Sequence, residues 1–150
     1  NLGISSTAIV LDETKTFLIK QKNVLVYASF GSNDPSSRSG RTFNEWANGS
    51  VANTFVSTSA RSFDYKATHN FYGGLLGQSL IADLIKEGAS GAIGYSFEPY
   101  MSGVARIDYL IPTYVAGYNF AESSYSSLAY LSWMSVVVGD PKMKLRNCEE

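Results

Sequence analysis

The stretch Asn23-Val24-Leu25-Val26-Tyr27-Ala28-Ser29 is the part of this sequence that decides its fold. It is an apolar run without polar alternation, the pattern of a strand that is covered on both faces in a parallel sheet. The run ends at Phe30-Gly31-Ser32-Asn33-Asp34-Pro35, where glycine, asparagine, aspartate and proline favour turns. We therefore expect a buried strand whose carboxyl end opens into a loop.

Other segments with strand or helix patterns follow and precede this run. Residues 78–87 carry apolar side chains at the spacing of one helix face and end at Gly88, which predicts a helix. Residues 107–133 predict one or two largely apolar helices around Gly117 and Asn119. Strands that alternate with helices predict an α/β fold with a mainly parallel sheet flanked by helices. The further predicted strands cover residues 6–11, 53–59, 92–97 and 136–138.

The size and composition of the chain limit its class and its partners. With 150 residues, 45% of them hydrophobic and 17% charged, we expect a single α/β domain over residues 1–150. A net charge of -1 leaves no basic footprint, so nucleic acid is not expected as a partner. The apolar runs are far shorter than the roughly 20 residues of a membrane span. The single cysteine, Cys148, excludes an internal disulfide and a cysteine-based metal site.

Ligands of parallel α/β sheets bind beyond the carboxyl ends of the strands. Those ends are expected here at residues 29–34, 57–62, 96–98 and 139–141. A hydrolytic site needs a nucleophile, a base and a group that orients the base. The side chains available for such a triad are Ser57 or Ser59, His69, and Asp64 or Asp34. Because serines are abundant and the lone histidine lies in an expected loop, we favour a structural histidine and assign no catalytic residue.

Three carboxylates follow predicted strands, namely Asp34, Glu98 and Asp140. If they converged, they could act as an acid–base pair or hold a divalent cation through oxygen ligands. Asp34 and Asp140 precede prolines, however, where aspartate accepts hydrogen bonds from the N–H groups of a turn. We therefore favour structural roles for them and predict neither a metal site nor a cofactor.

Tyrosines are frequent in the second half of the chain and could line a groove for a carbohydrate or a peptide. Tyrosine is amphipathic and is common both at core edges and in interfaces, and we favour the core. The tyrosines concerned are Tyr95, Tyr100, Tyr109, Tyr114 and Tyr118.

Three segments, taken together, resemble the catalytic domain of gingipain-type cysteine peptidases, which have the caspase-like α/β fold. Residues 133–145 are similar to the closing strand and Gly-Asp-Pro turn of that family. Residues 88–94 resemble its strand of small residues, and Val26-Tyr27-Ala28-Ser29-Phe30-Gly31-Ser32 is similar to its Tyr-x-Gly-His-Gly-Ser strand end. The resemblance implies a caspase-like three-layer sandwich in a truncated version.

The same resemblance implies that the peptidase chemistry is absent. The family's general base stands at the position of Phe30, which cannot accept a proton, and its cysteine belongs around Ser57-Thr58-Ser59, where no cysteine occurs. Glu98-Pro99-Tyr100 and residues 117–122 are similar to a bacterial family of gingipain-related proteins without established function. That similarity implies an exported or cell-surface protein and, with the start at Asn1, a C-terminal fragment of a longer chain.

Three hypotheses for the function follow. The first is a non-catalytic caspase-like domain that binds a protein or a small ligand at the degenerate active-site edge. The second is a hydrolase with rebuilt chemistry, and the third is a domain that forms a homodimer through an exposed sheet edge. The candidate binding edge consists of Ser29, Phe30, Gly31, Ser32, Asn33, Asp34, Ser57, Thr58, Ser59, His69 and Glu98.

Overall fold

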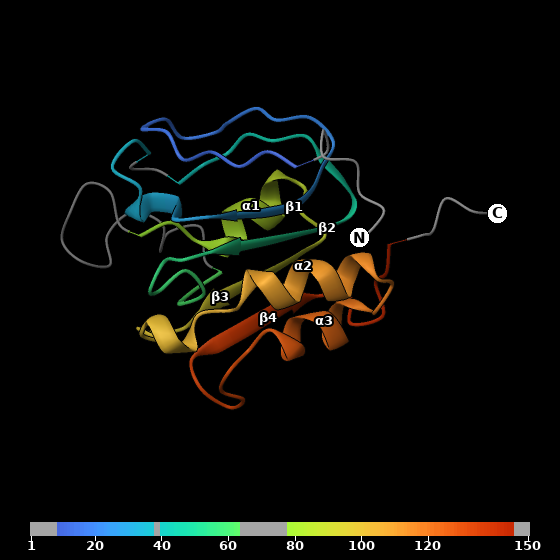
Figure 1. Ribbon diagram of the computed structural model, residues 1–150. Helices are drawn as coiled ribbons and strands as arrows, with labels where there is room; N and C mark the ends of the chain where they lie inside the picture. The colour runs from blue at the N-terminus through green and yellow to red at the C-terminus, as the bar shows by residue number, and fades with distance from the viewer. Residues whose placement is uncertain (1–8, 38–39, 64–77, 146–150) are drawn as a thin grey trace.

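The computed structural model of the chain describes residues 9–37, 40–63 and 78–145. These residues form an α/β fold in three layers, with a four-stranded sheet between one helix and a pair of helices (Figure 1). The elements are β1 (Val24–Ser29), β2 (Trp46–Thr54), α1 (Ile81–Glu87), β3 (Gly91–Tyr95), α2 (Ile107–Val115), α3 (Phe120–Ser126) and β4 (Ser135–Gly139), with 3₁₀ turns at Gly31–Asn33 and Met101–Gly103.

The sheet is mainly parallel, as the apolar runs predict. Its strand order is β1-β2-β3-β4, in which β1, β2 and β3 run parallel and β4 runs antiparallel to β3. Ala92 in β3 pairs with Ala52 in β2 on one side and with Val138 in β4 on the other. The parallel strands therefore all end at the same edge of the sheet.

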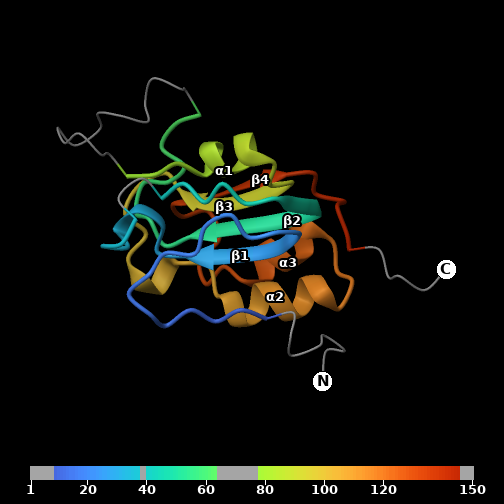
Figure 2. The ribbon, with the colours of Figure 1, turned by 90° about the horizontal axis from the view of Figure 1, so that it is seen from above.

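Each face of the sheet is covered by its own helices because successive residues of a strand point to opposite faces. Figure 2 shows α1 on one side of the sheet and α2 and α3 on the other. Ala52 and Ala92 pack with Ile81 and Leu84 of α1. The core on the opposite face consists of Val51, Ile93, Ala105, Leu110, Tyr114 and Phe120.

The inner strand β3 is buried along its whole length and carries glycine at two of its five positions, Gly91 and Gly94. A Cβ atom at Gly91 would lie 2.8 Å from the ring of Phe120, and one at Gly94 would lie 2.6 Å from Ser59 Oγ and 2.7 Å from Ile81 Cγ2. Contacts this short would force the neighbouring layers apart. Glycine at both positions therefore allows the helices to approach the sheet closely.

The helices end and begin at local signals that the sequence carries. The predicted helix at 78–87 starts three residues later, at Ile81, and ends at Gly88, whose φ of 118° places it in the left-handed region. The apolar stretch 107–133 contains α2 and α3, which are separated at Gly117, and it is not helical after Ser126. Asn119 starts α3 with a capping box, because its side chain accepts the Glu122 N–H and the Glu122 carboxylate accepts the Asn119 N–H.

Two strand predictions are wrong. A strand is expected at 53–59, but the observed strand β2 starts earlier, at Trp46, and ends at Thr54. It contains the Asn48-Gly49 pair, which is typical of a turn. The pairing with β1 is irregular there, since Val24 pairs with Trp46 but Val26 already pairs with Val51. The extra residues form a bulge that accommodates Gly49 at a φ of 78°.

The strand expected at 6–11 is not found in its described part. Residues 9–11 are exposed and have no regular structure, and the rest of that stretch lies outside the described residues. Among the helices of the described ranges, none is long and apolar enough to cross a membrane.

Tyr95 ends β3 and ties three segments together with polar contacts inside the core. Its side chain has no exposed surface, and its hydroxyl donates to Asn53 Oδ1 at 3.4 Å and accepts the Ala105 N–H at 2.8 Å. Its backbone N–H donates to Ser59 Oγ at 3.3 Å. Burial raises the pKa of Tyr95 to about 12, so the hydroxyl keeps its proton at neutral pH.

We expect Tyr95→Phe to lower the free energy of unfolding by about 1–3 kcal/mol, because it leaves the Ala105 N–H without a partner in the core. Denaturant unfolding measures this change. Tyr118→Phe is the matched control, because Tyr118 is exposed. Equal stabilities of the two variants would show that the Tyr95 hydroxyl holds nothing in place.

Candidate functional site

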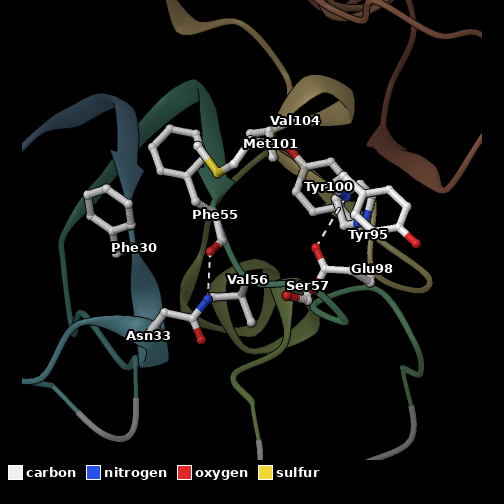
Figure 3. Close-up of a pocket in the computed structure, with 11 residues that line it drawn as sticks. Phe30, Asn33, Phe55, Val56, Ser57, Tyr95, Glu98, Tyr100, Met101 and Val104 are labelled. Carbon is white, nitrogen blue, oxygen red and sulfur yellow. Dashed lines mark hydrogen bonds between the residues drawn. The ribbon is translucent and has the colours of Figure 1, made fainter.

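A pocket lies where β1, β2 and β3 end. Its volume is about 230 Å³, and Figure 3 shows the side chains around it. Three loops, one after each parallel strand, supply these side chains, together with Tyr95 at the end of β3. The described residues that line the pocket are Phe30, Asn33, Phe55, Val56, Ser57, Tyr95, Glu98, Pro99, Tyr100, Met101 and Val104.

The loops after β1 and β2 form one wall and are fastened to each other. The rings of Phe30 and Phe55 lie edge to face, with their centroids 5.4 Å apart, and Asn33 Nδ2 donates to the Phe55 carbonyl at 2.8 Å. Gly31 turns the chain at a φ of 51°, and a Cβ there would lie 2.8 Å from Val56 Cγ2. Phe30 nevertheless keeps 57% of its surface exposed, so its ring is available to a ligand.

The loop after β3 forms the opposite wall around a strained residue. Tyr100 has a φ of 58° and a ψ of 165°, a region that residues other than glycine rarely adopt. The Glu98 carboxylate accepts the Tyr100 N–H at 3.2 Å, and Pro99 between them is buried. The turn presents Tyr100 and Met101 to solvent, with 66% and 83% of their surfaces exposed.

The pocket combines apolar walls with a single charge. Among the described lining residues, Glu98 alone has a charged side chain, and Ser57 and Asn33 add a hydroxyl and an amide. The remaining lining side chains are aromatic or aliphatic. Such a pocket suits an apolar group and disfavours a second negative charge.

The predicted residues after β1 divide into lining residues and structural ones. Phe30 and Asn33 line the pocket, whereas Ser29 Oγ accepts the Gly31 N–H at 3.0 Å and shapes the turn. Ser32 and Ser79 exchange hydrogen bonds, since each side-chain oxygen accepts the other's backbone N–H, at 2.8 and 3.3 Å. These contacts hold the loop after β1 against the residues that precede α1.

The predicted residues after β2 divide in the same way. Ser57 lines the pocket, whereas Thr58 is buried and donates through its N–H and its hydroxyl to Gln78 Oε1, at 2.9 and 2.6 Å. Ser59 has no exposed surface and accepts the Tyr95 N–H, so a substrate cannot reach it here. His69 and Asp64 lie outside the described residues, so the serine triad, which the sequence pattern does not favour, stays untested.

The three predicted carboxylates do not converge. Glu98 lines the pocket, but Asp34 is not among the lining residues and accepts the Ser36 N–H at 2.7 Å, as an aspartate in a turn does. Asp140 lies at the other end of the sheet, because β4 is antiparallel and Gly139 pairs with Gly91 at the start of β3. The described residues contain no group of three histidine, cysteine, aspartate or glutamate side chains that could hold a metal ion.

Several lining residues were not predicted as site residues. Phe55 and Val56 fall inside the strand that the sequence predicts at 53–59, but β2 ends at Thr54 and both residues lie in the loop beyond it. Met101 and Val104 follow the strand that was expected to end at residue 97 and carry no signal of their own. A polar or turn-forming residue marks a strand end in sequence, whereas an apolar lining residue resembles the core.

No family model, no curated protein and no solved structure matches this chain. The resemblance to gingipain-type peptidases therefore stays a prediction, and the site is interpreted from its own geometry and chemistry.

We expect Tyr100→Gly to be more stable than Tyr100→Ala by about 1 kcal/mol, because relief of roughly 1–3 kcal/mol of backbone strain exceeds the roughly 0.5–1 kcal/mol entropic cost of glycine. Denaturant unfolding of both variants measures this difference. At the control position, Tyr118, φ is not positive, so there the alanine variant should be the more stable one. The same order of stability of the glycine and alanine variants at both positions would contradict backbone strain at Tyr100.

Proposed function

We propose that this chain is a non-catalytic domain of the caspase-like type that binds a protein partner in the pocket beyond β1, β2 and β3. The observation that carries the proposal is the meeting of Phe30 and Ser57 in one pocket. The family resemblance puts the lost general base at Phe30 and the lost nucleophile around Ser57–Ser59. The positions that the resemblance gives to the general base and to the nucleophile thus line the same cavity, one after each of two neighbouring strands.

The chemistry of the pocket favours binding over hydrolysis. Phenylalanine cannot take a proton from a nucleophile, and the lining residues within the described ranges include neither histidine nor cysteine. Ser57 is the only serine, threonine or cysteine among the described lining residues, and it needs a base that takes its proton. Glu98 is the only carboxylate among them, and it accepts the Tyr100 N–H, while no hydrogen bond joins it to Ser57 in the described part of the chain. We therefore propose that the pocket retains the position of an active site without its chemistry.

The exposed rim favours a protein as the partner. Phe30, Tyr100 and Met101 present large apolar side chains to solvent around one cavity. Aromatic residues and methionine are enriched in protein interfaces, where a few of them carry most of the binding energy. An exposed group of such side chains around a pocket is typical of an interaction site.

We expect peptides selected on the wild-type protein from a random displayed library to bind Phe30→Ala at least about tenfold more weakly, because the variant removes one wall of the pocket. Its melting temperature should fall by less than about 4 °C, because the ring is largely exposed. Tyr109→Ala, at an exposed position on α2, is the control and should bind as the wild type does. Equal affinity for wild type and Phe30→Ala would contradict the proposal.

A second candidate function is assembly through the sheet edge at β4. Within the described ranges β4 pairs only with β3, so its other side offers unpaired backbone groups, and its residues Val136–Val138 carry no charge. Leu131 and Trp133 are exposed directly before the strand. A second copy could add its own β4 to this edge and form a two-fold dimer.

We expect the wild-type protein to show a concentration-dependent dimer in light scattering, and Leu131→Lys to shift it toward the monomer, because the new charge lies beside the pairing edge. Leu11→Lys, at an exposed position in the segment before β1, is the matched control and should leave the dimer unchanged. A wild-type protein that stays monomeric at every concentration tested would remove this candidate.

A further inference from the structure

We propose that the pocket binds an extended segment of a partner protein through one large uncharged apolar side chain and through the backbone N–H groups of that segment. In the same proposal, Glu98 excludes acidic groups from the pocket. This inference rests on the proposed function and deepens it by naming the chemistry of the partner. Three observations carry it, namely the apolar wall, the acceptor character of the polar wall and the size of the cavity.

The apolar wall requires an apolar occupant. Figure 3 shows the rings of Phe30 and Phe55 on one side of the pocket, and the Met101 side chain reaching toward Phe55 from the loop after β3. Phe30 and Phe55 already pack edge to face, so a third ring or a branched aliphatic group extends a packing mode that is present. Methionine adapts its shape to different apolar partners, so the wall can accept more than one side chain of this kind.

The polar wall favours hydrogen-bond donors from the occupant, because its one charged group is an acceptor and the Ser57 hydroxyl can accept as well as donate. Glu98 is acceptor-only when ionised, and its carboxylate can accept several hydrogen bonds, of which Tyr100 N–H supplies one. One of the two N–H donors of the Asn33 amide is already bonded to the Phe55 carbonyl. Backbone N–H groups of an extended segment match this arrangement, whereas a second carboxylate beside Glu98 meets like-charge repulsion.

The size of the cavity decides between a side chain and a free ligand. Its volume of about 230 Å³ is below the roughly 300–1,000 Å³ of pockets that enclose drug-sized ligands. The rim residues Phe30, Tyr100 and Met101 extend the apolar surface outward. One side chain fills the cavity, and the neighbouring residues of the same segment cover the rim.

The backbone strain at Tyr100 supports a binding role for this turn. The side chain of Glu98 holds the Tyr100 N–H, and Tyr100 and Met101 complete the pocket from the loop after β3. Strained residues persist where the surrounding structure fixes them, and they cluster at ligand-binding positions. The same carboxylate therefore shapes the wall and sets the charge selectivity of the pocket.

The test is an NMR titration of the ¹⁵N-labelled protein with two probes that carry the same phenyl ring and differ in charge. N-acetylphenylalaninamide is neutral and carries two amide groups, and N-acetylphenylalanine carries a carboxylate. We expect the amide to shift signals of residues 30–33, 55–57 and 98–101 and to bind at least about tenfold more tightly than the acid. N-acetylargininamide, which is cationic and lacks the ring, should bind more weakly than the neutral amide.

Glu98→Gln tests the source of this selectivity, because glutamine keeps a side-chain oxygen for the Tyr100 N–H and loses the charge. We expect the ratio of the affinities for the amide and the acid to fall below about threefold in this variant, since the like-charge repulsion is gone. Glu45→Gln is the matched control, because Glu45 is an exposed carboxylate directly before the start of β2, at the other edge of the sheet. It should keep the ratio of the wild type.

The outcomes separate this inference from the proposed function. Equal binding of amide and acid at the pocket, or tighter binding of the arginine probe, would overturn the inference and leave a binding pocket in place. An absence of shifts at the pocket would also overturn the inference, while Phe30-dependent capture of displayed peptides would still support the proposed function. Shifts confined to residues outside the pocket, together with Phe30-independent capture, would overturn both.

Discussion

The fold depends on how closely two layers of helices can approach the central strand β3. Gly91 meets the ring of Phe120 on one face, and Gly94 meets Ser59 and Ile81 on the other. Because a Cβ at either position would collide with these neighbours, both positions require glycine in a strand that is buried throughout. The distance between the layers is therefore set by the backbone of β3, and α1, α2 and α3 take their places from it.

The parallel direction of three strands creates the candidate site. β1, β2 and β3 are parallel, so three loops leave the sheet at one edge and surround the space beyond it. Tyr95 closes the floor of that space by bonding Asn53 and Ala105 from within the core. With the floor fixed, the loops can expose Phe30, Tyr100 and Met101, and the turn at Tyr100 can hold a strained backbone. The packing of the sheet therefore offsets the free energy that the exposed side chains and the strained Tyr100 backbone cost.

The sequence predicts the continuous elements and misses the features that depend on pairing. β1, α1, β3 and β4 follow from apolar runs and one helical stripe. β1 is, however, a half-buried edge strand and not the fully covered strand that its apolar run predicts, because no strand pairs with its outer side in the described part of the chain. β2 was displaced because a bulge against β1 absorbs Asn48-Gly49, and Asp140 was misplaced because an apolar run does not reveal strand direction. Phe30 and Ser57 were predicted at the site, but Phe55 and Met101 were not, since an apolar lining residue has the pattern of a core residue.

The central claim is that the pocket beyond β1, β2 and β3 is where a partner binds, and contacts across the interface test it most directly. The measurement is a set of intermolecular nuclear Overhauser effects between a captured peptide and the isotope-labelled protein. We expect contacts from an apolar side chain of the peptide to the ring protons of Phe30, Phe55 and Tyr100. Contacts to Leu131 and Trp133 beside β4, with none to the pocket, would contradict the claim.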